Sequence, residues 1–241
     1  MINACQRRIL TMKALKELLI ISSLVVSVLA ASPVLARKTA PAINDDGMEL
    51  IKDTKYSTVY ADPDANLGNY TGIWLQDASV EFKKNWKRNQ NRNTAGTMLR
   101  VKDSDVERIQ EDMATLFREV FTAELLEGGY QLVEEAGENV LIARPAIVDL
   151  DIFAPDLRTA QRNFSYSESA GEMTLMLDLY DSLTNDKIVT SKDRQRDFER
   201  GFREWRTSVN NRATAKRMIS SWATAFTELL DYERVSVADA D

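Results

Sequence analysis

The chain has 241 residues, of which 44% are hydrophobic and 28% are charged, and its formal net charge is −6. This is ordinary composition for a globular protein. Histidine is absent, which excludes Ser-His-Asp triads, imidazole general bases and histidine-bound zinc.

The first residues have the pattern of a secretory signal peptide. Four Lys and Arg residues at positions 7–16 precede an uncharged apolar run, residues 18–29, and small residues follow. As a helix this run rises about 18 Å, which is short of a hydrocarbon core of roughly 30 Å. We expect residues 1–36 to be removed near Ala36, which would leave a periplasmic or secreted protein. An uncleaved leader would instead anchor the protein in the membrane.

Removal of residues 1–36 would change the chemistry of the chain. The only cysteine, Cys5, would be lost, so the mature chain would have neither disulfide bonds nor a catalytic thiol. The remainder holds 27 Lys and Arg against 36 Asp and Glu, a formal charge of −9. An acidic exported domain is a poor partner for nucleic acid, and we expect none. Residues 29–32 have the form of a lipoprotein box with Ser32 in place of the lipid-bearing cysteine, and Met12 is an alternative start.

An N-terminal arm and a first strand come next. Residues 37–69 show little periodicity and contain turn formers, which predicts an extended arm. A strand is expected at residues 70–82. Its apolar positions change phase between Leu75 and Val80, and one flat strand cannot bury both phases on one face. The small and polar residues 76–79 therefore predict a bulge or bend that directs both halves to the core.

A basic stretch and a helix follow. Residues 83–102 contain seven Lys and Arg and no acid, and their polar middle predicts a loop or a ragged helix start. Ser104, with Glu107 three residues later, matches a capping box. Apolar residues then recur at helical spacing until Gly128-Gly129 ends the helix.

Four more strands are expected. Residues 130–133 form a short strand and residues 139–153 a long one, in which Pro145 implies an edge position or a bulge. Residues 172–180 alternate apolar and polar, and a turn at residues 184–186 leads into the strand 187–198, so these two strands form a hairpin.

A second amphipathic helix is expected after a loop near Asn210. Its apolar stripe holds Ala215, Met218, Ile219, Trp222, Ala223, Phe226, Leu229 and Leu230. The order β-α-β-β-β-β-α predicts a single α+β domain, residues 70–232, with a mostly antiparallel sheet and two amphipathic helices packed on one face. Residues 233–241 are expected to be a flexible tail.

Three stretches resemble a known family. They are NLGNYTGIWLQDASVEF, YQLVEEAGENVLIARPAIVDLDIFAP and GEMTLMLDLYDSLTNDKIV. They are similar to the first strand, the central hairpin and the later hairpin of the bacterial domain of unknown function 3313, over roughly residues 46–230. The resemblance implies an exported envelope protein, often a lipoprotein, of unassigned role, and it supplies no catalytic residues. Ser32 departs from the lipoprotein pattern.

Two basic stretches with aromatic residues, 83–102 and 192–217, are candidate contact surfaces. The predicted contact patch consists of Lys83, Lys84, Trp86, Lys87, Arg88, Arg203, Trp205 and Arg206. Its partner would be an envelope protein, an anionic membrane or a glycan surface. The alternative is a solvated strand end and loop.

Asp149 and Asp151 are weak catalytic candidates. Two residues apart on a strand, they would share a face, near Asp178 and Asp181 of the next strand. Paired carboxylates held at roughly 5–9 Å perform glycoside hydrolysis, and carboxylate oxygens also bind calcium. The alternative is a hydrated sheet face. We expect no cofactor.

Three functions therefore stay open. The leading hypothesis is a non-enzymatic binding or assembly module of the cell envelope. The second is a carboxylate-type hydrolase acting on an envelope glycan. The third is an acyl-chain carrier, in which the stripe Met218, Trp222, Phe226 and Leu229 would line an apolar pocket if the helix and sheet were splayed apart.

Overall fold

The structure is a computed structural model. It describes residues 39–92, 100–153, 165–167, 170–197, 204–206 and 208–238, with the backbone alone for 165–167, 204–206, 208–209 and 232–238. Met1–Thr39 and Ala40–Asp241 are separate units, and the architecture below belongs to the second. The predicted signal peptide lies outside the described residues. Within those ranges no helix is both long and apolar enough to cross a membrane.

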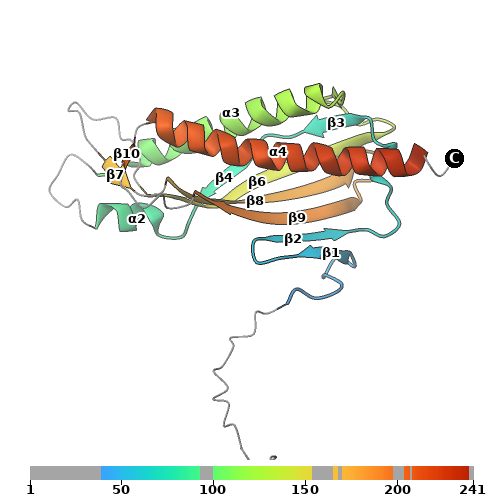
Figure 1. The fold of residues 1–241 in the computed structure, drawn as a ribbon, viewed down its shortest axis with the longest axis horizontal. Coiled ribbons are helices and arrows are strands. Elements are labelled where there is room, and N and C mark those ends of the chain that lie inside the picture. Colours follow the sequence, from blue (N-terminus) through green and yellow to red (C-terminus); the bar gives the residue numbers. More distant parts are fainter. Residues whose placement is uncertain are drawn as a thin grey trace, which may run out of the picture. The chain divides into compact units, whose positions relative to one another are not determined.

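Eight strands within the described ranges form one sheet (Figure 1). Its order is β1-β2-β9-β8-β6-β3-β5, and β4 pairs with β6 beyond the end of β3. The strands are β1 (Glu49–Asp53), β2 (Ser57–Ala61), β3 (Gly72–Leu75), β4 (Ser79–Phe82), β5 (Gln131–Leu132), β6 (Val140–Ile152), β8 (Gly171–Asp181) and β9 (Lys187–Arg196). A separate ladder joins β7 (Ser165–Ser167) to β10 (Glu204–Arg206).

Antiparallel pairing dominates the sheet, as predicted. It joins β1, β2, β9, β8 and β6 in succession, whereas β3 and β4 run parallel to β6, and β5 runs parallel to β3. Parallel strands need a long crossover connection. The helix α3 (Asp103–Glu127) supplies it between β4 and β5. The fold is α+β.

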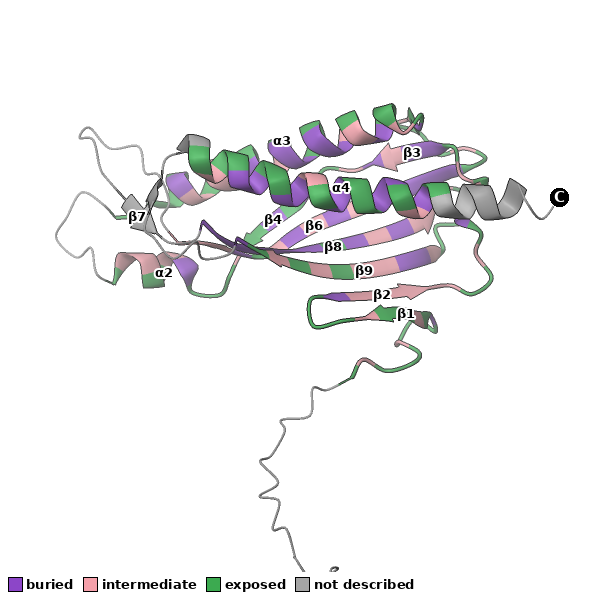
Figure 2. Cartoon of the chain, in the orientation of Figure 1, coloured by how far each residue is buried: buried purple, intermediate pink, exposed green. Residues whose placement is uncertain are grey.

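The two long helices, α3 and α4 (Ser208–Ala238), cover the same face of the sheet (Figure 1), which confirms the predicted arrangement. Their buried side chains form one hydrophobic cluster with the inward residues of the sheet, the purple bands of Figure 2. Phe117 and Phe121 of α3 stack with 4.0 Å between ring centroids. Phe226 of α4 lies 6.2 Å from Phe121. Two short helices, η1 (Leu67–Asn69) and α2 (Trp86–Asn91), complete the described elements.

The strand predicted at residues 70–82 bends where its apolar phase changes. β3 ends at Leu75 and β4 begins at Ser79, and both pair with β6. Leu75 and Val80 are buried in the core on either side of the break, so the predicted bend is confirmed. The predicted burial of the apolar positions 173, 175, 177 and 179 of β8 is also confirmed, but Glu172 and Thr174 on the other face are buried as well.

Pro145 lies inside the sheet, so its predicted edge position is wrong. It belongs to β6, which has β8 on one side and β3 and β4 on the other. The amide of Gln76 donates to the Ala143 carbonyl at 3.0 Å. Pro145, two residues further on, faces the same side, at the point where β3 has ended and β4 begins. The interrupted neighbour therefore leaves no ladder bond for the missing amide to make.

The predicted extended arm, residues 37–69, instead contains two strands of the sheet, β1 and β2. β1 and β2 extend the sheet from β9, with residues Ser57–Ala61 paired to β9 throughout. The tyrosine hydroxyl of Tyr60 donates to the carbonyl of Pro41 at 3.0 Å, so the chain is held from its first described residues. β1 and β2 show little apolar alternation, because they lie at the edge of the sheet and are held by backbone pairing more than by burial.

The predicted helix ends also differ. Helix α3 begins at Asp103, and the carboxylate of Asp105, not the pair Ser104 and Glu107, caps it by accepting from the Lys102 amide at 3.0 Å. Helix α4 begins before Asn210 and is helical through Ala238, within the predicted tail. The observed cap lies two residues before the predicted one, and only the backbone geometry selects between the two.

We expect Phe121→Ala to lower the free energy of unfolding by about 3–5 kcal/mol, because a fully buried ring between α3 and α4 would leave a cavity. Chemical denaturation measures the change. Leu126→Ala on the same helix is the matched control: Leu126 is 57% exposed, and its loss should stay within about 0.5 kcal/mol. Equal losses for the two variants would contradict the packing of α3.

Candidate functional site

A cavity of about 210 Å³ lies where α3 and α4 meet the ends of β6 and β8. The helices line it with residues between Arg108 and Leu116 and between Asn211 and Met218. The sheet lines it with Leu150–Ile152 and Ala170–Met173. Both helices contribute from their N-terminal halves, so the cavity lies toward the same end of each.

Small side chains leave this space open. Ala170, Gly171 and Ala215 line the cavity, whereas large side chains, among them Phe121 and Phe226, fill the corresponding space further along the two helices. Beside the larger lining residues, these three positions fill little of the space between the helices and the sheet.

The inner walls are apolar. Met113 and Leu116 of α3, Leu150 of β6, Met173 of β8 and Met218 of α4 are all buried and line the cavity. Methionine side chains are flexible and polarisable, and they adapt to irregular apolar partners. The walls therefore suit hydrocarbon rather than a polar substrate.

The exposed end of the cavity carries charge. We call Arg108, Asp112 and Arg212 the rim, since their side chains are 24%, 63% and 49% exposed. Arg108 pairs with Asp105 and Asp112 at 3.6 and 3.4 Å, and Arg212 pairs with Glu119 of α3 at 2.7 Å. The site thus combines an apolar interior with a charged rim.

A bulge in β6 shapes the sheet side of the cavity. Asp149 has φ of 53°, and the pairing of β6 with β8 shifts register between Val148 and Asp151. Beyond the bulge, Gly171 has φ of 143°, and a Cβ there would lie 2.0 Å from the carbonyl oxygen of Asp151. Only glycine allows this approach of two backbones. The cavity floor is therefore fixed by the main chain.

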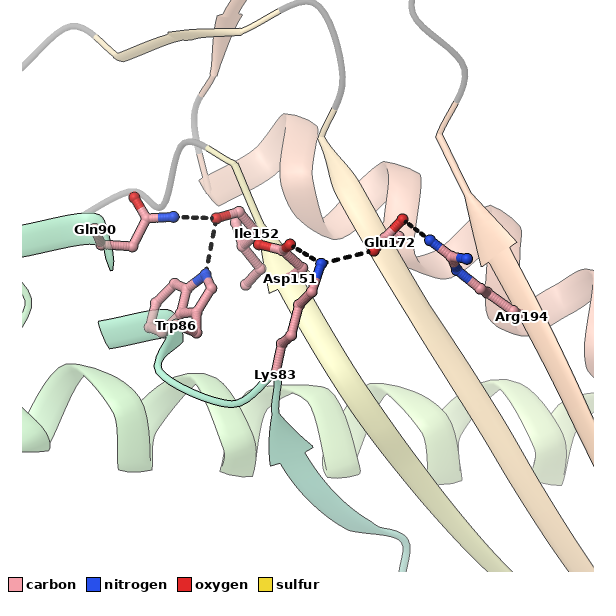
Figure 3. Close-up of polar contacts among 7 residues, drawn as sticks. All are labelled: Lys83, Trp86, Gln90, Asp151, Ile152, Glu172 and Arg194. Atoms are coloured by element: carbon pink, nitrogen blue, oxygen red, sulfur yellow. Dashed lines mark hydrogen bonds and ion pairs between the residues drawn. The ribbon is translucent and has the colours of Figure 1, made fainter. Parts of the chain in front are cut away.

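An ion-pair network crosses the sheet beside the cavity (Figure 3). Lys83, which follows β4, donates to Asp151 of β6 at 2.8 Å and to Glu172 of β8 at 3.1 Å. The guanidinium of Arg194 on β9 donates to the other oxygen of Glu172. Two cations and two carboxylates thus connect four strands, β4, β6, β8 and β9.

The network keeps Glu172 and Lys83 charged. Burial opposes ionisation of Glu172, but the hydrogen bonds and charges of Arg194 and Lys83 outweigh it and hold the pKa of Glu172 below its ordinary value. Hydrogen bonds from Lys83 to Asp151 and Glu172 raise the pKa of Lys83. A carboxylate held ionised in this way is a poor general acid.

Trp86 and Gln90 of α2 hold the end of β6 from the side (Figure 3). The indole Nε1 of Trp86 and the amide nitrogen of Gln90 donate to the carbonyl oxygen of Ile152 at 3.0 and 2.8 Å. The Trp86 ring stacks on Phe82 with centroids 4.0 Å apart. These bonds satisfy a carbonyl at the strand end where β6 lines the cavity.

The predicted pairing of Asp149 with Asp151 is wrong. The bulge at Asp149 breaks the two-residue alternation on which a shared face depends, and Asp149 is exposed while Asp151 is paired with Lys83. The cross-strand neighbour of Asp151 is Glu172, whereas Asp178 and Asp181 lie opposite Arg144 and Leu141 further along β6. The arrangement that carboxylate hydrolysis or calcium binding would need is therefore not formed by these residues.

The residues in the first half of the predicted contact patch do not form one surface. Lys84 and Arg88 are exposed, whereas Trp86 is 3% exposed and belongs to the interior. Lys83 is engaged in the network, and Lys87 pairs with Asp103. An aromatic residue between lysines suggested a surface, but the ring turns inward to satisfy Ile152.

In the second half of the patch, which consists of Arg203, Trp205 and Arg206, the structure describes no side chain. Arg203 lies outside the described residues. Trp205 and Arg206 belong to β10, where the backbone pairs with Tyr166 and Ser165 of β7. The contact role of these three residues stays a prediction.

The stripe of α4 is divided between the core and the cavity. Met218 lines the cavity, while Trp222 and Phe226 are buried in the hydrophobic cluster and Leu229 packs against it. Trp222 also donates from its indole to Asp193 at 2.8 Å. Met218 is therefore the stripe residue that lines the cavity, and the other three pack in or against the core.

Sequence reasoning singled out neither Arg108 nor Glu172, and it included Arg194 and Arg212 only as members of the basic stretch 192–217. Glu172 and Arg194 had a detectable signal, because the predicted hairpin register places them on neighbouring strands with opposite charge. The rim had none, since arginines on helix surfaces are usually solvated.

The chain belongs to the protein family described as a protein of unknown function, DUF3313, whose model matches residues 41–226. The resemblance noted from three stretches of sequence is thereby confirmed. No curated protein matches the sequence.

Similar solved structures include bacterial lipoproteins and related chains. A minor lipoprotein from Acinetobacter baumannii matches with 10% identity and a TM-score of 0.32, over 68% of this chain and 95% of that one. A DUF4136 family protein from Bacteroides thetaiotaomicron matches with 14% identity and a TM-score of 0.33, over 74% and 98%. A PelC dodecamer from Paraburkholderia phytofirmans matches with 6% identity and a TM-score of 0.31, over 68% and 91%. Similarity at this level does not establish a common role.

We expect Glu172→Gln to flatten the pH dependence of stability. The folded-state pKa of Glu172 lies below the ordinary value of 4.5, so its charge stabilises the fold above that pH, and the contribution is lost as the pH falls through the folded-state pKa. Urea unfolding at neutral and acidic pH should show a difference between variant and parent that shrinks with acidification. The control is Glu135→Gln at an exposed site. A difference that grows with acidification would contradict the network.

We expect Gly171→Ala to destabilise the fold by about 1–3 kcal/mol or more, because the new Cβ meets the Asp151 carbonyl in a backbone region that L residues avoid. Gly137→Ala is the matched control, since the nearest atom to its Cβ, on Val140, is 3.5 Å away. Thermal unfolding of both variants gives the comparison. A stable Gly171→Ala variant would show that β6 and β8 do not approach so closely.

Proposed function

We propose that this chain is an exported protein of the bacterial cell envelope that binds an apolar ligand between α3, α4 and the sheet. The observation that carries the proposal is the cavity of about 210 Å³ with buried apolar walls and a charged rim. Protein interiors are otherwise close-packed, and voids of this size are few. A space that is lined by glycine and alanine and lies next to well-packed aromatic rings supports the binding of a ligand.

The energetics favour a ligand with hydrocarbon. Removing apolar surface from water contributes about 25 cal/mol per Å². The walls offer Met113, Met173 and Met218 as well as leucines, all already shielded from solvent. An apolar group that enters would therefore gain burial without displacing polar contacts of the protein.

The chemistry of the neighbouring charges supports binding rather than catalysis. Asp151 and Glu172 are held by Lys83 and Arg194, and the pKa of Glu172 is lowered rather than raised. General acid catalysis near neutral pH requires a carboxyl group with a raised pKa. The network instead fixes the strand ends that form one wall of the site.

Export is supported by the sequence of residues 1–36, with its basic, apolar and small segments in the order of a secretory leader. A periplasmic or secreted location after cleavage near Ala36 follows from that reading, with membrane anchoring if the leader is retained. Lys84 and Arg88, both exposed, remain candidates for contact with an anionic membrane, a glycan or an envelope protein.

We expect Ala215→Phe to abolish binding of 1-octanol, because the ring would occupy the cavity that Ala215 lines. Ala213→Phe is the matched control, since Ala213 is exposed on the same helix. Isothermal titration calorimetry measures binding, and circular dichroism confirms that each variant folds. If Ala215→Phe unfolds the protein, Ala215→Leu tests the same point. Unchanged binding in folded Ala215 variants, or no binding by the parent, would contradict the proposal.

We expect mass spectrometry of the native protein, released gently from the envelope fraction, to show a mature N-terminus near Arg37. The same spectrum reports any lipid and any retained apolar ligand. A full-length chain in the cytosolic fraction would contradict export.

A further inference from the structure

We infer that the ligand is a single-chain amphiphile with an anionic head group, held with about eight carbon atoms inside the cavity and its head group at Arg108 and Arg212. This inference rests on the proposed function and adds the class of ligand to it. Three observations carry it: the size of the cavity, the position of the rim, and the compensation of the neighbouring acids.

The size of the cavity limits the ligand to one chain. An engineered protein cavity of about 150 Å³ accommodates benzene, a ring of six carbons. The cavity here measures about 210 Å³, which in proportion corresponds to roughly eight carbon atoms. One short chain, or the end of one longer chain, fits this space. The two chains of a diacyl lipid do not.

The rim places cationic groups at the exposed end of the apolar walls. Arg108 comes from α3 and Arg212 from α4, and both line the cavity. Their side chains are 24% and 49% exposed, while the walls below, such as Met113 and Met218, are buried. A ligand whose chain lies against the methionines would therefore present its polar end to the two guanidinium groups.

The acidic residues at the cavity do not cancel the preference of the rim for an anionic head group. Asp151 and Glu172 are occupied by Lys83 and Arg194 on the sheet. Asp112 is 63% exposed, and its contact with Arg108 is long, at 3.4 Å. Exposed ion pairs of this kind stabilise little, so a ligand carboxylate or phosphate can compete with Asp112, while the pair of Arg108 with the less exposed Asp105 is kept.

Arg212 engages a single carboxylate among the described residues. A guanidinium group carries five N–H donors in a planar fork that matches carboxylate and phosphate oxygens. Arg212 engages Glu119 through Nη2, and a pair with one carboxylate uses only part of the fork. Charge-assisted hydrogen bonds from the remaining donors would fix the head group at the rim.

The chain-length part of the inference is tested by calorimetric titration of the purified protein with hexanoate, octanoate, decanoate and dodecanoate. Each carbon added up to octanoate should lower the dissociation constant about fourfold, the value for burial of one methylene. Beyond octanoate the gain per carbon should fall sharply. A constant gain through dodecanoate, or equally tight binding of a diacyl phospholipid, would overturn the inference.

The head-group part is tested with octanol against octanoate. The parent protein should prefer octanoate, and Arg212→Gln should weaken octanoate binding about tenfold, the loss of one hydrogen bond to a charged group, while octanol binding is unchanged. Arg108→Gln should act in the same way. Lys216→Gln is the control, because Lys216 is exposed on the same helix.

The outcomes separate this inference from the proposed function. Equal binding of octanol and octanoate, or equal octanoate binding by Arg212→Gln and Lys216→Gln, would overturn the anionic head group and leave an apolar site. Failure of every compound, including octanol, would overturn both. Folding of each variant is checked by circular dichroism before titration.

Discussion

The packing of two helices on one face of a single sheet is the constraint on which the rest of this structure depends. α3 and α4 share their apolar stripes with the inward residues of the sheet in one cluster. The rings of Phe117, Phe121 and Phe226 set the spacing of the helices toward their C-terminal ends. Toward the N-terminal ends of the two helices lies the cavity, whose lining includes the small residues Ala215 of α4 and Ala170 and Gly171 on the sheet side.

Several features of the sheet also shape the end of the structure at which the cavity lies. The bulge at Asp149 shifts the register of β6 against β8, and Gly171 then allows the two backbones to meet at Asp151. Lys83 joins Asp151 to Glu172, and Trp86 bonds the carbonyl of Ile152. Bulges are frequent next to binding sites because they re-aim side chains. Here the bulge turns Asp149 away and leaves Leu150 and Ile152 toward the cavity.

Much of this architecture was predictable from local patterns. The two amphipathic helices, the hairpin of β8 and β9 and the bend between β3 and β4 follow from spacing and turn residues, since period and capping are local properties. The family resemblance also came from three stretches of sequence and is confirmed by the family match over residues 41–226. The errors concern residues whose role depends on distant partners. β1 and β2 exist through edge pairing with β9, and Trp86 is buried because a carbonyl of β6 needs a donor.

The sequence by itself determined the class of the protein. The leader pattern, the absence of histidine and the apolar periodicities can all be read along the chain. They predict an exported α+β domain, and they exclude histidine chemistry. Only the tertiary structure decided which charged and apolar residues meet. Arg108, Arg212 and Glu172 are far apart in the chain, and their common location depends on strand register and helix spacing. A one-residue bulge in β6 was enough to separate Asp149 from Asp151, because side-chain direction in a strand reverses at every residue.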